Sequence, residues 1–138
     1  MASTFQTTDV ANGEPARAGI GVTSVTKTYA VLAALVINDV IQMIKVPAGA
    51  VILDMILEAD DLDDGTAIVL DVGDGSDTGR FIDGSTIAQA GGMGRMDQAG
   101  GVGYEYSAED TIDVLVETAP TTGTTGNITL SVIYTLDK

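Results

Sequence analysis

The stretch from Met43 to Ser85, MIKVPAGAVILDMILEADDLDDGTAIVLDVGDGSDTGRFIDGS, decides the fold that the sequence predicts. Turn signals divide it into short apolar runs. Pro47 and Gly49 suit the second and fourth places of a type I turn, because proline presets φ and glycine relaxes the exit. The acidic, glycine-ended segments 60–65 and 73–79 cannot enter a core unpaired and are predicted loops. The runs that remain are predicted strands at residues 40–46, 51–57 and 67–72.

Short strands separated by such close turns predict an all-β chain with an antiparallel β-sandwich. Apolar and polar residues alternate with a period of two in the later part of the chain, which adds further strands. These later strands are predicted at residues 81–87, 112–117 and 128–135. Together the runs give about seven or eight strands in a jelly-roll-like sandwich over residues 29–138. Residues 1–28 are polar and weakly patterned, and are predicted to form an extended N-terminal arm or an edge strand.

Three segments carry further expectations. The alanine-rich apolar run at residues 29–37 fits either a strand or a short buried helix, and Asn38-Asp39 then predicts a turn. Residues 88–103 are rich in glycine and read as one long loop, a kind that is usually functional or disordered. Apolar side chains occupy both faces of the predicted strands at residues 40–46 and 51–57, which indicates cover by a second sheet on one side and by an arm or subunit on the other.

Composition excludes several classes of function. The chain has 138 residues, no histidine, no cysteine and a formal net charge of −14. This acidity argues against nucleic acid and anionic membranes as partners, because basic side chains are needed to bind both. Missing histidine and cysteine remove the commonest general base, the hydrolase triad, thiolate chemistry and the usual zinc site. No G-x-S-x-G or P-loop motif occurs, so we predict no catalytic residue, no cofactor and no enzyme activity.

Carboxylates are the remaining candidates for a chemical site. Asp71, Asp74 and Asp77 are weak calcium candidates, but their spacing misses the calcium-loop pattern, and turn aspartates that bond their own backbone explain them more simply. No metal site is therefore assigned. Arg80 is expected to screen these carboxylates as an exposed ion pair worth at most ~1 kcal/mol. The carboxylates of Glu105, Glu109 and Asp110 suit a glycosidase by residue type only. Tryptophan is absent and aromatic residues make up 4% of the chain, which counts against a sugar site.

Five segments carry turn and strand patterns that belong together: IKVPAGA at residues 44–50, DVGDG at 71–75, Arg80-Phe81, YEYSAEDTI at 104–112 and the closing strand at 129–134. With these patterns the chain resembles small structural proteins of tailed-bacteriophage heads, over roughly residues 29–138. The resemblance carries over no catalytic residue.

Some members of this group are capsid cement or decoration proteins, and the resemblance implies that role. The chain would bind the outer shell of a tailed-phage head as a homotrimer, stabilise the shell by bridging subunits, and have the major capsid protein as its partner. It would be made in the host cytoplasm and reside on the outer surface of the capsid. The acidic loops at residues 60–64 and 71–77 would face solvent or a basic patch. Contacts with the shell or with neighbouring subunits are expected at Phe5, Val10, Ile20, Val22, Val25, Met93, Arg95 and Met96.

Two other classes stay open. One is a tail, baseplate or fibre component of the same virion. The other is an extracellular calcium- or glycan-binding β-sandwich, which the missing tryptophan disfavours, as does the lack of a basic region in the first residues of a would-be signal peptide.

Overall fold

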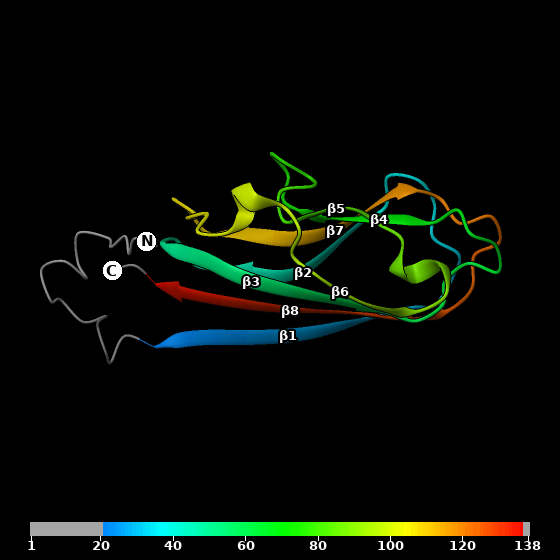
Figure 1. Ribbon diagram of the computed structural model, residues 1–138, viewed down its shortest axis with the longest axis horizontal. Helices are drawn as coiled ribbons and strands as arrows, with labels where there is room; N and C mark the ends of the chain where they lie inside the picture. Colours follow the sequence, from blue (N-terminus) through cyan, green and yellow to red (C-terminus); the bar gives the residue numbers. More distant parts are fainter. Residues whose placement is uncertain (1–20, 137–138) are drawn as a thin grey trace, which may run out of the picture.

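The computed structural model describes residues 21–136, which form two antiparallel sheets packed face to face (Figure 1). One sheet has the strand order β1-β8-β3-β6 and the other has the order β2-β7-β4-β5. Two short 3-10 helices, η1 and η2, lie in the connections. The elements are β1 (Val22–Val31), β2 (Val40–Val46), β3 (Ala50–Ala59), β4 (Val69–Gly73), β5 (Ile82–Ser85), η1 (Ile87–Gln89), β6 (Gly92–Arg95), η2 (Ala99–Gly101), β7 (Asp110–Thr118) and β8 (Gly126–Leu136).

The strand pairing is that of a jelly roll. The first strand pairs with the last, β2 with β7, β3 with β6, and β4 with β5, and every pair is antiparallel. The chain is therefore one long hairpin whose closed end is β4–β5, rolled up so that its strands fall into two sheets. Two four-stranded sheets connected in this way define the double-sheet jelly roll. The predicted all-β sandwich is confirmed.

A β-bulge explains why β3 carries apolar residues on both of its faces in the sequence. The pairing with β8 shifts between Ile52 and Asp54, so that Leu53 is an extra residue. Ile52 is buried before the bulge and Met55 after it, three positions later instead of two. A bulge leaves one residue unpaired and re-aims the side chains that follow. Ile52 and Met55, which strict alternation would place on opposite faces, thus face the same core.

The same device operates in β2. Its pairing with β7 shifts between Gln42 and Ile44, and Ile41 and Ile44 are both buried. Met43, the extra residue, packs half-buried against the core. The two bulges therefore explain part of the two-faced apolar pattern, while Val40 and Leu53 stay exposed, and cover of the outer faces by an arm or subunit remains a prediction.

The core lies between the two sheets, and the predicted alternation of the last two strands is confirmed. Inward residues of β7 and β8, such as Val114 and Leu130, are fully buried, while Leu115 on the outer face is half-buried. Phe81, at the end of the connection from β4 to β5, is also fully buried. Within residues 21–136 no helix has both the length and the apolar character that crossing a membrane requires.

Three local expectations need correction or refinement. The run at residues 29–37 is neither a separate strand nor a helix: Tyr29 to Val31 end β1, and residues 32–39 form a loop. The glycine-rich segment 88–103 is not a single loop, because it contains β6, which pairs with β3. The predicted boundary at residue 28 falls inside β1, so residues 22–28 are part of an edge strand. Residues 1–20, where the rest of the predicted arm falls, lie outside the described residues.

Candidate functional site

Exposed apolar side chains gather in one segment of the chain. Of the large apolar side chains that are exposed among the described residues, half come from residues 29–40, which we call the apolar β1–β2 segment. Leu32 is 83% exposed, and Val36 and Ile37 are each 57% exposed. The segment links β1 to β2 at the end of the sandwich opposite the chain termini (Figure 1). Exposed apolar residues concentrated in this way mark interaction sites.

Hydrogen bonds hold this segment in place. The Asp39 carboxylate accepts a bond of 2.8 Å from the Val36 amide, and the Asp39 amide donates one of 3.1 Å to the Val36 carbonyl. Asn38 has a φ of 68°, the left-handed conformation that asparagine tolerates, and its amide donates to the Val116 carbonyl at 2.8 Å. The predicted Asn38-Asp39 turn is confirmed. These hydrogen bonds fix the turn in the free protein. Binding through Val36 and Ile37 would therefore lose little backbone conformational entropy.

The residues predicted to contact the shell do not form one patch. Val22 begins the edge strand β1 and is 61% exposed, whereas Met93 lies in β6, the opposite edge of the same sheet, and is 60% exposed. Val25 and Met96 are half-buried and pack against the core. Arg95 is exposed and pairs with Asp54 of β3 across the β3–β6 pair. Phe5, Val10 and Ile20 lie outside the described residues.

Asp74 forms a buried ion pair with Arg80, in place of the exposed pair that the sequence predicts. The Asp74 side chain has no exposed surface and that of Arg80 is 16% exposed. Arg80 Nε donates to Asp74 Oδ2 at 2.8 Å, and the Tyr106 hydroxyl donates to the same oxygen at 2.8 Å. The Arg80 guanidinium also lies 3.9 Å from the ring centroid of Tyr104. Charge pairing, a hydrogen bond and a cation–π contact therefore meet at one point.

This cluster fixes the connection between β4 and β5. The Asp74 Oδ1 atom accepts bonds from the Ser76 amide and hydroxyl and from the Asp77 amide, all within 3.0 Å. Burial opposes the charge on Asp74, but the bonds from Arg80, Tyr106 and Ser76 outweigh it and hold the pKa of Asp74 below its ordinary value. Burial and the neighbouring Asp74 charge raise the pKa of Tyr106. Both oxygens of Asp74 are thus engaged within the protein.

Asp63 shows the same use of an acidic residue in the other loop. Its side chain is buried, and its carboxylate accepts bonds from the amides of Gly65, Ala67, Ile68 and Thr122, at 2.8 to 3.1 Å. Burial opposes the charge, yet these amides lower the pKa of Asp63. The acidic loops were expected to face solvent or a basic patch. The other aspartates of these segments are exposed as expected, at positions 60, 61, 64 and 77. Asp63, Asp71 and Asp74 are instead buried: backbone amides satisfy Asp63, a guanidinium pairs with Asp74, and one amide partly satisfies Asp71.

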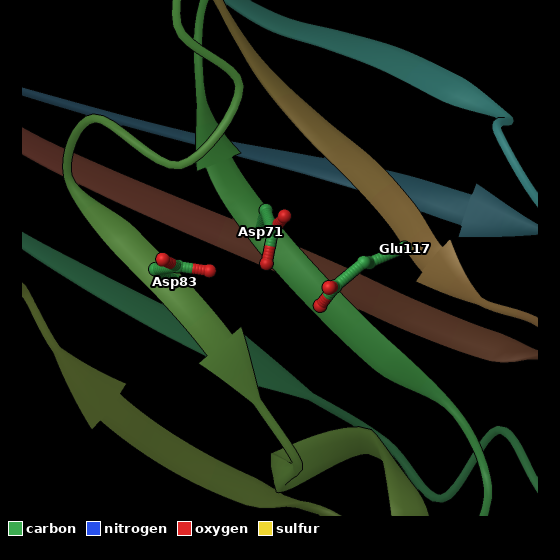
Figure 2. Close-up of side chains that lie close together, drawn as sticks. All are labelled: Asp71, Asp83 and Glu117. Atoms are coloured by element: carbon green, nitrogen blue, oxygen red, sulfur yellow. The ribbon is translucent and has the colours of Figure 1, made fainter.

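Asp71 lies in a cluster of three carboxylates with Asp83 and Glu117. The three residues come from β4, β5 and β7, and Figure 2 shows their side chains converging over the outer face of the sheet. One carboxylate oxygen from each lies within 4.8 Å of the others. Asp71 is buried and accepts a 2.8 Å bond from the Gly84 amide. Oxygens at such spacing suit a hard cation, although only Asp71 belongs to the predicted calcium candidates.

The pKa values show the electrostatic strain in this cluster. Burial raises the pKa of Asp71, and the nearby Asp83 charge adds to the rise. The Asp71 charge is the largest cause that raises the pKa of Glu117. Carboxylates forced together titrate as a group, and protonation relieves their repulsion. Asp77, the third calcium candidate, instead accepts a 3.3 Å bond from the Gly79 amide within its own turn.

Solved structures with this fold come from phage capsids. A chain from the capsid of Ralstonia phage GP4 is 28% identical with a TM-score of 0.78, and the match covers 90% of each chain. A chain from the Cyanophage Pam1 capsid asymmetric unit is 27% identical with a TM-score of 0.79 over 99% of each chain. The chain resembles phage head structural proteins. The predicted resemblance is thereby confirmed, and it supports a structural role in a phage capsid and a location in the virion.

A third structure extends the fold comparison. A chain from the acidic stable capsid structure of Helicobacter pylori bacteriophage KHP30 is 17% identical with a TM-score of 0.58, covering 86% of this chain and 95% of that one. At this identity the likeness shows the fold alone. Neither a protein-family model nor a curated protein sequence matches the chain.

Sequence reasoning did not identify the apolar β1–β2 segment as a group of exposed side chains. The signal was present, because the apolar run at residues 29–37 has neither a strand nor a helix period and ends in a turn pair.

Proposed function

We propose that the chain is a cement or decoration protein, which binds the outer shell of a tailed-phage head and stabilises it by bridging subunits of the major capsid protein. The observation that carries this proposal is the apolar β1–β2 segment, which is held by hydrogen bonds at one end of the sandwich and contains half of the exposed large apolar side chains of the described residues. The capsid origin of the similar structures supports the same placement. Made in the host cytoplasm, the protein would act on the outer surface of the capsid.

The mechanism is surface burial. A protein that binds the assembled shell more tightly than free subunits shifts the equilibrium toward the shell by that difference in affinity. Fully burying one leucine side chain contributes about 1.5–3 kcal/mol, so Leu32 and its neighbours can supply much of the contact energy. We further propose a homotrimer, whose three linked contacts add avidity. The residues ahead of β1 complete the proposal as an arm toward the shell or a neighbouring subunit.

Cosedimentation with phage heads that lack the protein tests this function. Leu32→Ser should weaken binding about tenfold or more, since it removes roughly 1.5–3 kcal/mol of apolar burial. Val102→Ser is the matched control, because Val102 is 61% exposed on η2's flank, away from the apolar β1–β2 segment. If both variants bound heads equally well, the apolar β1–β2 segment would not be part of the interface. Binding to purified tails but not to heads would favour the tail-component alternative.

The oligomeric state has its own measurement. Light scattering of the purified chain should give three times the 14.1 kDa mass of one chain, with or without a calcium chelator. A chelator-independent monomer would contradict the free trimer. A fold that loosens on chelation would instead favour the calcium-binding sandwich and the carboxylate cluster of Asp71, Asp83 and Glu117.

A further inference from the structure

A small hollow opens on the outer face of the sheet that contains β2, β7 and β4. Its volume is about 190 Å³. That is more than a single water needs and less than the roughly 300–1,000 Å³ of pockets that hold drug-sized ligands, so it matches one side chain. Val40 and Leu115 form apolar walls, and the turn after β4 closes it with Gly73, Gly75 and Thr78.

Asp74 and Asp113 both line this hollow, and Arg80 and Tyr106 already engage the Asp74 carboxylate, which leaves that of Asp113 available. Asp113 lines the hollow and is 9% exposed, and its buried Oδ1 atom accepts no hydrogen bond from any residue in the described range 21–136. Burial raises the pKa of Asp113, and the charges of Asp110 and Asp74 raise it further, against a lowering by the Thr111 hydroxyl. A buried, unpartnered carboxylate oxygen is rare in proteins and costs stability.

None of the four basic side chains within residues 21–136 lines the hollow, and Lys27 lies on β1, in the other sheet. Lys45 pairs with Glu109 at 3.0 Å, while Arg80 and Arg95 pair with the two aspartates described above. The chain as a whole has 20 acidic against 6 basic residues. Asp113 is therefore placed to accept a positive charge that comes from a partner.

We propose that this hollow receives a lysine side chain of the shell protein, with its methylene stem against Val40 and Leu115 and its ammonium on Asp113 Oδ1. This inference rests on the proposed function, because it places the lysine on the shell. Lysine fits better than arginine, since an ammonium is a compact charge on a flexible four-carbon stem, whereas a guanidinium favours two acceptor oxygens side by side. A single buried Oδ1 atom matches the former.

A direct test uses n-butylammonium chloride as the probe and NMR of the backbone amides. Saturable shifts are expected at residues 73–78 and at Asp113, and n-butanol, the neutral analogue, should not produce them. Asp113→Asn should weaken this binding at least tenfold, as expected for loss of a buried charge partner. Glu58→Gln, which neutralises an exposed carboxylate on β3 in the other sheet, is the control and should leave it unchanged. No saturable shift, or equal shifts with n-butanol, would overturn the proposal.

The second arm measures binding to phage heads. Asp113→Asn should lower the affinity about thirtyfold, from the penalty of truncating one partner of a buried charge pair, while Glu58→Gln should bind like the wild type. The same Asp113→Asn substitution should raise the melting temperature of the free protein, because it removes a buried unpaired charge, so misfolding cannot explain lost binding. Wild-type affinity in Asp113→Asn would refute the lysine contact. If butylammonium binds but the wild-type chain does not bind heads, the proposed function is wrong. The assignment of the lysine to the shell protein is then wrong as well.

Discussion

Replacing Arg80 by methionine tests the physical reasoning about the β4–β5 connection most directly. Methionine keeps a long, flexible apolar stem but removes the guanidinium that pairs with Asp74. Asp74 then stays buried with a charge that only hydrogen-bond donors oppose. We expect a clear loss of stability, because a charge left without its partner in the interior is costly.

The magnitude follows from the contacts. Removing one partner of a buried ion pair costs about 3–5 kcal/mol, and loss of the cation–π contact with Tyr104 adds about 0.5–2 kcal/mol. Asp74 keeps the Tyr106 hydroxyl and the amides of Ser76 and Asp77 as donors, which reduces the penalty. The free energy of unfolding should therefore fall by about 3 kcal/mol at neutral pH.

Urea unfolding, followed by circular dichroism at a fixed protein concentration, measures this difference. The matched control is Arg95→Met, because Arg95 pairs with Asp54 on the surface and its side chain is 70% exposed. That substitution should cost at most ~1 kcal/mol. A double variant, Arg80→Met with Asp74→Asn, should recover part of the loss, since it removes the unpaired charge.

The pH dependence has a definite sign. The pKa of Asp74 is lowered from an ordinary 3.8, so its charge stabilises the fold above that pH, and this contribution is lost as the pH falls through the folded-state pKa. The gap between wild type and Arg80→Met should accordingly narrow below about pH 4. An Arg80→Met loss no larger than that of Arg95→Met, or a gap that widens in acid, would refute the reasoning.

Two further predictions concern the same sheet. Asp71→Asn should raise the free energy of unfolding at neutral pH, because it relieves repulsion with Glu117. The pKa values of both carboxyls are raised, so this gain in stability should disappear in acid, where both are protonated. A pH series of thermal melts measures this. Gly73→Ala should cost about 1–3 kcal/mol, since its Cβ would collide with the Asp77 backbone carbonyl, whereas Gly75→Ala meets no atom within 4 Å and should stay within about 0.5 kcal/mol in the same urea assay.

The sequence predicted the strands well where local patterns were strong. Residues 40–46 match β2, and the alternation at Ile112, Val114 and Val116 correctly gave the buried face of β7. Alternation and turn residues are local properties, because each strand needs one apolar face and each turn needs particular backbone angles. The fold class follows from such local signals. Composition alone shows that no catalytic group of histidine or cysteine can form, since the chain has neither residue.

Only the tertiary structure decided where the carboxylates and apolar residues act. Asp74 and Tyr106 are 32 positions apart, and Asp113 lies on an outward position of β7 that alternation marks as solvent-facing. The turn after β4 folds over that face and buries it, which no periodicity records. Likewise the bulges at Leu53 and Met43 turned two apparent apolar faces into one, because one extra residue reverses the direction of every side chain that follows.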